Sequence, residues 1–315
     1  MGCTIGVDVG GTKIAAGVVD ADGRIVDRIR RPTPAASGPA ITDAVCTAVE
    51  ELVARSGGDV EAVGVGIAGF VDDGRSTVVF APNLALRGEP LRDRIVRRTG
   101  LPAVVENDAN AAAWGEARFG AGRGTRHLVC VTLGTGIGGG VVLDGRLYRG
   151  GSGVAAEIGH LRVVPDGRRC GCGNQGCWEQ YASGRALVAE ARDLARGAPA
   201  EAELLLKLAG GDPDRIEGPE ITRAALEGDP AARECFRTVG RWVGQGLADL
   251  AAVLDPERFV VGGGVSDAGD ILLEPVRRSF ARHVTGRAVR SLADIRGAEL
   301  GAAAGIVGAA DLARV

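Results

Sequence analysis

The sequence has few aromatic residues, few histidines and no long apolar run. Only 3% of its 315 residues are aromatic and three are His, so the core must consist mainly of Val, Ile, Leu and Ala. No apolar run approaches the ~20 residues that a membrane-spanning helix needs. The net charge is -3, both signs are interspersed, and no basic block indicates nucleic-acid binding. We therefore expect a protein that binds neither membranes nor nucleic acid.

The cysteine pattern and the first residues of the chain predict the cellular compartment of the protein. Of seven cysteines, four lie singly in apolar patterns, the usual place of buried thiols: Cys3, Cys46, Cys130 and Cys235. A strand pattern starts almost at the first residue, so we expect no signal peptide. Both observations predict a reducing cytoplasm.

The other three cysteines lie in a glycine-rich segment beside a histidine. Residues 157–179 read E-I-G-H-L-R-V-V-P-D-G-R-R-C-G-C-G-N-Q-G-C-W-E. The four residues with metal-ligand spacing are His160, Cys170, Cys172 and Cys177, and Cys₃His is a common ligand set of structural zinc. A disulfide or free thiols are the alternative. Glu157 and Glu179 flank the segment, and a rigid zinc loop would aim them at a ligand; otherwise they are ordinary surface acids or neighbours of the metal.

A first glycine turn lies between two β-branched runs in residues 4–20. The turn reads Gly10-Gly11-Thr12-Lys13, and a strand rather than a helix comes next, so this is not a Walker loop. Successive backbone N–H groups in such a turn form a nest for phosphate oxygens. Asp8 ends the preceding strand, where a carboxylate beside phosphate would hold Mg²⁺ or a water of its shell. A tight hairpin without a ligand is the alternative.

A second turn repeats this pattern in residues 128–149. A β run leads into Gly134-Thr135-Gly136-Ile137-Gly138, and then Gly140-Val141-Val142 matches Gly17-Val18-Val19. Asp144-Gly145-Arg146 likewise matches Asp22-Gly23-Arg24. The match indicates an internal duplication. The turn also fits the G-x-G-x-x-G dinucleotide fingerprint, but that motif requires a helix directly after it, whereas a strand and hairpin are predicted here.

A third glycine cluster, Gly262-Gly263-Gly264, comes after a short strand at 258–261. Bare backbone at a strand end permits close approach of a flat ring or a ribose. Simple loop flexibility is the alternative for this cluster alone. Three glycine turns, each after a strand, together favour a nucleotide site.

An acidic motif lies directly after the strand predicted at 101–105. It reads Glu106-Asn107-Asp108-Ala109-Asn110 and enters an alanine-rich helix, with Asn107 or Asp108 near the N-cap. Asp108 is either a helix cap or a general base that accepts the proton of an attacking hydroxyl. We predict the second role, with Asn107 binding a neighbouring hydroxyl. Trp114, further along the helix, is expected in the core.

The remaining segments alternate between helical and strand patterns. A buried strand is expected at 63–69, and a turn at 81–84 whose Asn83 either faces a ligand or serves the turn itself. Residues 31–39 predict a Pro-rich turn, and residues 197–219, which are polar and contain Gly and Pro, predict a mobile segment. Helices are expected at 40–56, 90–99, 183–196, 229–254, 271–284 and 300–313. This order of elements indicates an α/β protein.

These motifs resemble the ROK family of sugar kinases and repressors, particularly its actinobacterial ATP-dependent glucokinases. The motifs that carry the resemblance run almost end to end: 8–13, 106–110, 133–138, 157–160 and 170–179. The resemblance implies an α/β, two-lobed actin-like ATPase (ribonuclease H-like) fold. Residues 1–106 plus 300–315 would form the small lobe, and 107–299 the large lobe with the zinc-binding loop.

The resemblance also implies ATP-dependent phosphorylation of glucose at the 6-hydroxyl, with Mg²⁺ and a structural Zn²⁺. The implied catalytic residue is Asp108. The implied sugar-binding set is Gly69, Asn83, Asn107, Asp108, Glu157, His160 and Glu179. The implied nucleotide set is Asp8, Gly10, Gly11, Thr12, Lys13, Gly134, Thr135, Gly136, Ile137, Gly138, Gly262, Gly263 and Gly264. The implied zinc ligands are His160, Cys170, Cys172 and Cys177.

His160 belongs to both the zinc set and the sugar set. One ring nitrogen of an imidazole binds zinc while the other, as N–H, donates to a hydroxyl. The metal would then be structural in its coordination and functional in its effect.

Two other functions compete with a glucose kinase. The same machinery would serve fructose, mannose or an N-acetylhexosamine, or take polyphosphate as donor. A non-catalytic sugar-sensing regulator is the other class, and the lack of a helix-turn-helix pattern before the first strand argues against it. As partners we expect a small sugar, ATP and further copies of this chain in a dimer or tetramer.

Overall fold

The computed structural model describes residues 2–34 and 38–314. Its chain forms two compact units, which are described separately. Unit 1 comprises Met1–Cys130, Gly140–Ala156 and Glu299–Val315, and unit 2 comprises Val131–Gly139 and Glu157–Ala298. The lobes predicted from the family, divided at residues 106 and 300, stay a prediction. Part of the predicted Pro-rich turn, residues 35–37, lies outside the described residues.

The first sheet belongs to unit 1 and has five strands in the order β3-β2-β1-β4-β8. The bounds are β1 (Cys3–Val9), β2 (Lys13–Val19), β3 (Ile25–Pro32), β4 (Val60–Ile67) and β8 (Ala103–Asn107). β1, β2 and β3 pair antiparallel, and β1, β4 and β8 pair parallel. β1 and β4 are almost entirely buried, as parallel strands covered on both faces are.

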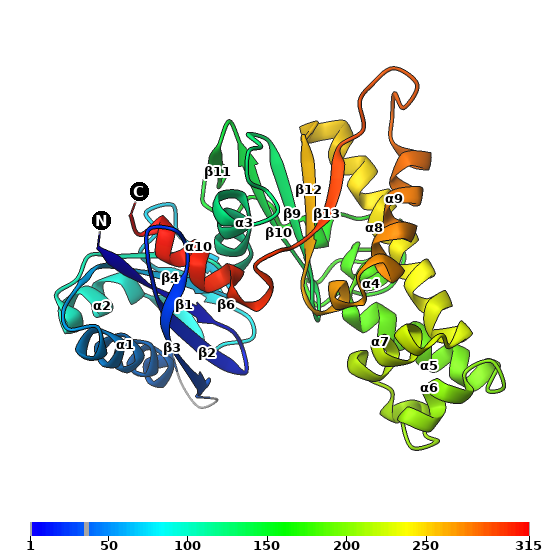
Figure 1. Cartoon of the computed structure of the whole chain (residues 1–315), viewed down its shortest axis with the longest axis horizontal. Helices are drawn as coiled ribbons and strands as arrows, with labels where there is room; N and C mark the ends of the chain where they lie inside the picture. Colours follow the sequence, from blue (N-terminus) through cyan, green and yellow to red (C-terminus); the bar gives the residue numbers. More distant parts are fainter. Residues whose placement is uncertain (1, 35–37, 315) are drawn as a thin grey trace. The chain divides into compact units, whose positions relative to one another are not determined.

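The helices of unit 1 pack on this sheet (Figure 1). They are α1 (Gly38–Arg55), α2 (Leu91–Thr99), α3 (Asp108–Phe119) and, after a short 3₁₀ turn at Gly301–Ala303, α10 (Ala304–Leu312). The apolar face of α1 joins the strands in one core. The predicted helices at 40–56, 90–99 and 300–313 are therefore present with slightly different ends.

Glycines let α10 approach its neighbours closely, and Figure 1 shows α10 in red beside β1 and α3. A Cβ at Gly64 of β4 would lie 1.7 Å from the Ala309 carbonyl oxygen, and one at Gly308 would lie 1.7 Å from that of Ala111. Asp311 accepts hydrogen bonds from Trp114 Nε1 at 2.8 Å and Arg118 Nε at 3.2 Å. The last helix therefore fixes α3, and Trp114 is buried as predicted.

A small antiparallel sheet completes unit 1 and was not predicted. Its strands are β5 (Phe70–Val71), β6 (Val78–Ala81) and β7 (Leu86–Glu89). Two predicted sugar-binding positions adjoin it, because Gly69 precedes β5 and Asn83 lies in the β6–β7 turn.

The second sheet has the order β11-β10-β9-β12-β13. Its strands are β9 (Leu128–Leu133), β10 (Ile137–Leu143), β11 (Arg146–Tyr148), β12 (Arg258–Gly262) and β13 (Asp294–Gly297). In chain order, each strand takes the position of its counterpart in the first sheet, which confirms the internal repeat. A strand, β10, comes after the second glycine turn, so the dinucleotide fingerprint lacks its helix here.

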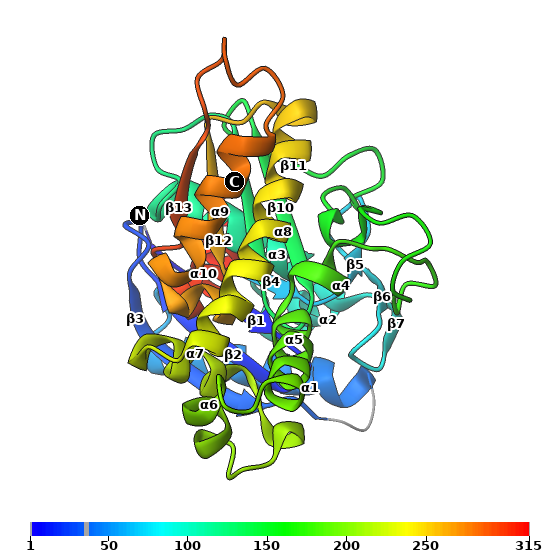
Figure 2. The ribbon, with the colours of Figure 1, turned by 90° about the vertical axis from the view of Figure 1, so that its right-hand side faces the viewer.

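The helices of unit 2 come after the zinc segment. They are α4 (Glu179–Ala182), α5 (Gly184–Gly197), α6 (Glu203–Leu208), α7 (Gly218–Glu227), α8 (Pro230–Leu254) and α9 (Asp270–His283), with short 3₁₀ turns at Ile158–His160, Pro213–Arg215 and Gly264–Ala268. α8 and α9 lie side by side (Figure 2), because Gly244 leaves no Cβ against the Val276 carbonyl.

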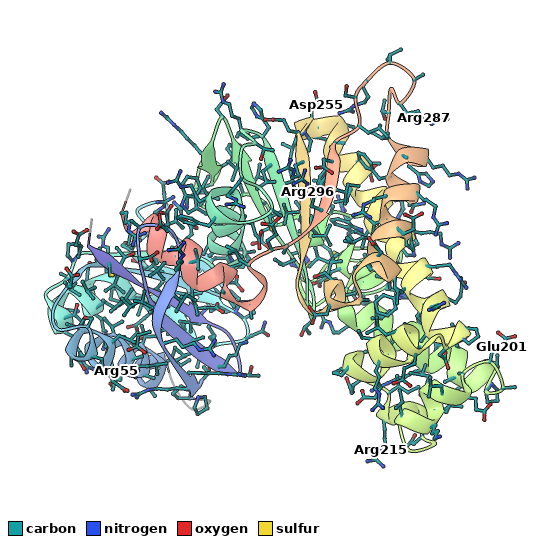
Figure 3. The ribbon with its side chains drawn as sticks, viewed as in Figure 1. Arg55, Glu201, Arg215, Asp255, Arg287 and Arg296 are labelled. Carbon is teal, nitrogen blue, oxygen red and sulfur yellow. The ribbon has the colours of Figure 1, made fainter. Side chains whose placement is uncertain are left out.

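Residues 197–219, for which no helix is predicted, contain regular secondary structure, and their mobility stays a prediction. This segment contains α6, a 3₁₀ turn and the start of α7. Its many charged residues face solvent, as Figure 3 shows for Glu201 and Arg215, which point away from the helices. Leu205 and Ile216, both fully buried, supply the apolar anchors. Among residues 2–34 and 38–314, no helix is both long and apolar enough to cross a membrane.

Candidate active site

Two aspartates meet at one edge of the first sheet. β1, β4 and β8 are parallel, and Asp8 pairs with Gly66, which in turn pairs with Glu106. Asp108 comes directly after β8 and opens α3. Gly66 lies on the strand between the two acids, and a Cβ there would lie 3.2 Å from the Ala111 Cβ and 3.6 Å from the Asp108 Cα. The sheet therefore brings Asp8 and Asp108 to the carboxyl ends of β1 and β8, the two strands that flank β4.

Asn107 is the N-cap of α3, as the sequence predicts. Its Oδ1 accepts the Asn110 backbone N–H at 3.0 Å. Its Nδ2 donates to Asp108 Oδ1 at 3.1 Å and to the Gly69 carbonyl at 3.2 Å. Both amide N–H groups are thus engaged. A ligand hydroxyl would donate to the remaining lone pair of Oδ1 or displace one of these bonds.

Both carboxyl groups at this edge hold their protons more tightly than usual. Burial raises the pKa of Asp108 above its ordinary 3.8, opposed by the backbone N–H groups of Ala109 and Asp108 and by the Asn107 amide. Burial and then the Asp108 charge raise the pKa of Asp8 to about 6, although Lys13 lowers it. Two acids that disfavour each other's charge fit a divalent cation, so Asp8 is suited to hold Mg²⁺.

Glu106 anchors this edge from inside the protein. It is 1% exposed, and its Oε2 forms ion pairs with Arg149 Nε at 2.8 Å and Arg75 Nε at 3.1 Å. Its Oε1 accepts the Asn107 backbone N–H at 2.9 Å and Asn110 Nδ2 at 3.1 Å. Glu106 therefore holds Asn107 and Asn110, one before and one after Asp108 in the chain, in their places.

Arg149 extends this network beyond Glu106. Its guanidinium donates to the carbonyls of Asp72 and Asp73, each at 2.8 Å. Sequence reasoning missed Arg149, because its partners are far away along the chain and no local pattern connects them.

The first glycine turn lies open beside Asn83. Gly10 N donates to the Lys13 carbonyl at 3.0 Å, and Thr33 Oγ1 donates back to the Gly10 carbonyl at 2.6 Å. Gly11 and Thr12 are exposed. A Cβ at Gly11 would lie 3.5 Å from the Asn83 carbonyl oxygen. The turn thus has a fixed base and a free tip, as a phosphate nest requires.

Four residues of the zinc segment converge as predicted. The ligand atoms of His160, Cys170, Cys172 and Cys177 all lie within 4.8 Å of one another. Cys172 Sγ and Cys177 Sγ are 3.6 Å apart, as are Cys170 Sγ and His160 Nδ1. A tetrahedron with Zn–S bonds of ~2.3 Å has ligand separations of about 3.8 Å, so these residues fit zinc. Nδ1 faces the cluster, which leaves His160 Nε2 for another partner.

Glu179 connects the zinc segment to the second glycine turn. It is buried, and its Oε1 accepts a hydrogen bond from Cys170 Sγ at 3.0 Å. Its Oε2 lies 2.4 Å from the position of a Cβ at Gly136, so any side chain there would displace this carboxylate. Glu157 is exposed, and its carbonyl accepts the His160 N–H at 3.1 Å.

A cavity of about 1030 Å³ opens in unit 2 beside the second and third glycine clusters. Gly134, Thr135 and Gly264 line it, as expected for nucleotide-binding positions. Gly263 has φ +85° and packs on Leu133, where a Cβ would lie 2.5 Å from the carbonyl oxygen. The cavity wall also contains residues of α5 and α7 that sequence reasoning missed: Arg185, Arg192, Glu217, Thr222, Arg223 and Leu226.

One local signal was available for α7. The helix begins with a capping box: the Glu217 side chain accepts the backbone N–H of Glu220, and the Glu220 side chain accepts that of Glu217. Pro219 lies in the first turn. The neighbouring glycines and prolines concealed this signal by suggesting a loop.

Comparisons with known proteins show similarity along nearly the whole chain. The family model described as "ROK family" matches residues 4–315. A glucokinase of Streptomyces coelicolor is 57% identical over 314 residues, covering 100% of this chain and 98% of that protein. N-acetylmannosamine kinases of Escherichia coli are 38% identical over 264 residues, with 83% of each chain covered.

A solved structure extends the similarity to the fold. The crystal structure of a ROK family glucokinase from Streptomyces griseus in complex with glucose and AMPPNP has a TM-score of 0.91 and 58% identity, covering 99% of each chain. The predicted α/β fold class and the zinc-type ligand cluster are thereby confirmed. From the match along nearly its whole length, this chain belongs to the ROK family.

Proposed function

We propose that this chain catalyses the ATP-dependent phosphorylation of glucose at its 6-hydroxyl, giving glucose 6-phosphate and ADP. The observation that carries the proposal is the pair Asp8 and Asp108 at the carboxyl edge of the first sheet, each with a raised pKa. The full-length similarity to proteins named glucokinase, one of them solved with glucose and AMPPNP, supports the choice of sugar and donor.

In this proposal, Asp108 is the catalytic residue. Phosphoryl transfer needs little covalent help from the protein, so a carboxylate that orients the hydroxyl and accepts its proton is the main chemical group required. The N-terminus of α3 and the Asn107 amide hold the Asp108 carboxylate in place. Burial raises its pKa toward the working pH, which makes it a better proton acceptor than an ordinary aspartate.

In the proposal, the glycine turns bind the phosphates and the adenosine of the nucleotide. The open tip at Gly11 and Thr12, together with Lys13, offers N–H groups and a positive charge, and Asp8 would hold Mg²⁺. Bound Mg²⁺ supplies charge neutralisation for the phosphate oxygens. The turn from Gly134 to Gly138 and the cluster Gly262–Gly264 take the remaining nucleotide positions, and the unit 2 cavity is large enough for an adenosine.

The zinc segment positions the sugar-binding groups of unit 2. Zinc at the four-residue cluster would fix His160 with Nδ1 on the metal, so that Nε2 as N–H donates to a sugar hydroxyl. Glu179 is buried beside Cys170, and Glu157 opens the turn that carries His160. The proposed sugar set also includes Gly69, Asn83 and Asn107.

A coupled ADP-release assay over a sugar panel tests this function. Purified zinc-loaded protein with Mg²⁺ and ATP is supplied with glucose, fructose, mannose, N-acetylmannosamine or N-acetylglucosamine. We expect the largest kcat/KM for glucose, with one glucose 6-phosphate per ADP. Absence of sugar-dependent ADP formation would reject the kinase and leave the sugar-sensing regulator.

N-acetylmannosamine is the second candidate substrate, because kinases named for it are 38% identical over most of this chain. To bind this sugar, the protein must accommodate an acetamido group at the sugar's second carbon. A kcat/KM for N-acetylmannosamine above that for glucose in the same panel would replace glucose as the substrate. Polyphosphate offered in place of ATP tests the strictness of the donor site.

Two further predictions concern the protein's setting. The first is a cytoplasmic location, where thiols stay reduced; the described cysteines form no disulfide. A dimer or tetramer stays a prediction, which light scattering of the purified chain would test.

A further inference from the structure

Arg185 stands between the second glycine turn and the proposed sugar acid of unit 2. It is the second residue of α5, whose N-cap Ser183 accepts the Ala186 N–H. Its Nε donates to the Thr135 carbonyl at 3.0 Å, and its Nη2 lies 3.5 Å from Glu179 Oε1. One side chain therefore contacts both the turn predicted to bind phosphate and an acid predicted to bind sugar.

The remaining donors of Arg185 are unused and accessible. A guanidinium has five N–H donors, and Nη1 makes no hydrogen bond within the described residues 2–34 and 38–314. The side chain is 60% exposed and lines the cavity of unit 2. Since an arginine side chain with two fixed contacts has already lost much of its freedom, a further contact costs little additional ordering.

Two other arginines in the cavity wall differ from Arg185. Arg192 donates to the Ile216 carbonyl and to Glu217 Oε1 at 2.8 Å. Arg223 donates to Glu227 Oε1 at 2.8 Å on its own helix. Both guanidinium groups are thus engaged in hydrogen bonds to residues of α7 or to the residues just before it. Arg185 instead donates to the glycine turn, at the Thr135 carbonyl, and its Nη1 makes no hydrogen bond within the described residues.

We infer that Arg185 is a phosphate-binding residue of the nucleotide site, whose guanidinium contacts the phosphate chain while its Nε stays on Thr135. Charge-assisted hydrogen bonds to phosphate are about twice as strong as neutral ones, and a guanidinium forms them in pairs. Its contact with Glu179 links the phosphate end of the nucleotide to the sugar end of the site. This inference rests on the proposed function for the identity of the nucleotide.

The experiment compares two ligands that differ in phosphate alone. Calorimetry measures the Kd of AMPPNP with Mg²⁺, and separately of adenosine, for the wild-type protein, Arg185→Met, Arg185→Lys and Arg196→Met. Met keeps an unbranched apolar stem but lacks the guanidinium and its charge. Arg196 is the matched control, because it is an exposed arginine of α5 that pairs with Asp193 and Asp214 away from the cavity. Zinc content and melting temperature verify that each variant is folded.

Loss of the charged hydrogen bonds predicts a 10- to 100-fold weaker Kd for AMPPNP in Arg185→Met. Adenosine binding should change less than about twofold, Arg185→Lys should be intermediate, and Arg196→Met should match the wild type. Unchanged AMPPNP affinity in Arg185→Met, or an equal loss for adenosine, would overturn the inference.

A third titration, with glucose alone, separates phosphate binding from support of Glu179. We expect Arg185→Met to keep its glucose affinity. A loss confined to glucose would assign Arg185 to Glu179 and reject a phosphate role. The two proposals also fail separately, since an Arg185-dependent Kd for AMPPNP without sugar-dependent ADP release would support this inference while rejecting the kinase.

Discussion

The two five-stranded sheets have the same strand order but differ in the residues around their glycine turns. In the first copy, Asp8 precedes the turn and Asp108 lies two strands away at the same edge. In the second copy, Val131 takes the position of Asp8 when Gly140 is aligned with Gly17, and this valine is fully buried. The turn offers N–H groups in both copies, but only the first has an aspartate on the strand that leads into it. Under the proposed function, both turns bind phosphate and only the first copy provides the proton acceptor.

The copies also differ in the segment after their third strand. In the first copy α1 comes directly after β3. In the second, the segment between β11 and α8 contains the zinc residues and α4 to α7. This insert brings Glu179 and Arg185 to the second turn. The second copy thus has a cavity and an Arg–Glu pair beside its turn, where the first copy has two aspartates.

Among these variants, Asp108→Asn should have the largest effect, because it removes the proton acceptor proposed for the first copy. The amide keeps the size of the side chain but cannot accept the proton, so we expect kcat to fall by about 10²- to 10⁴-fold. Glucose affinity, measured by calorimetry, should stay within a few-fold of the wild type. Near-normal turnover would show that Asp108 is not the base. The proposal that the first copy provides the proton acceptor would then be wrong.

The buried anchor of the first copy is tested by Arg149→Met. This change leaves Glu106 with one ionic partner fewer in the interior, which typically costs about 3–5 kcal/mol of unfolding free energy. Urea denaturation measures the loss. Arg24→Met is the control, because Arg24 pairs with Asp22 on the open surface and should cost under ~1 kcal/mol. Equal stability of the two variants would contradict an anchoring role for Arg149.

Asp8→Asn sharpens the comparison with Val131. The pKa of Asp8 is raised to about 6, so its contribution to stability is present below pH 3.8 and is lost as the pH rises through about 6. At pH 8 the ionised group should destabilise the fold by about 3 kcal/mol, since each unit is 1.36 kcal/mol. The variant should therefore gain stability over the wild type at pH 8 but not at pH 4.

Two readouts check this prediction. Urea denaturation at both pH values gives the unfolding free energies, and Mg²⁺-dependent AMPPNP binding should weaken in the same variant. A variant that is less stable than the wild type at pH 8 would show that Asp8 is held by favourable contacts instead.

The zinc insert of the second copy is tested by Cys172→Ser. Loss of the metal frees His160 and its neighbours, so the KM for glucose should rise about 10- to 100-fold while the KM for ATP changes less. Cys3→Ser, outside the cluster, is the control. A folded, zinc-free variant with unchanged glucose KM would mean that the insert is a structural staple only.

Local features of the site could be predicted from the sequence. Asn107 as the N-cap depends on neighbours in the chain, as do the strand after each glycine turn and the four-residue metal cluster. The repeat was visible because matched turns recur at a fixed distance. Backbone geometry of this kind is set by a few adjacent residues.

The rest depends on contacts between distant segments. Arg149 with Glu106 and Arg185 with Thr135 are side-chain pairs that no spacing rule connects. β13 and the small β5–β7 sheet are short strands whose pairing partners define them. Their propensities are weak, so tertiary packing decides their structure.

The pH dependence of a single turnover in the wild type and in Asp108→Asn tests the central claim most directly. A general base works only when deprotonated, so the wild-type rate should rise with pH through the raised pKa of Asp108, above its ordinary 3.8. In the variant, both the fast rate and this acid limb should disappear while glucose and nucleotide still bind. A variant with the same acid limb and a rate within tenfold of the wild type would contradict the account.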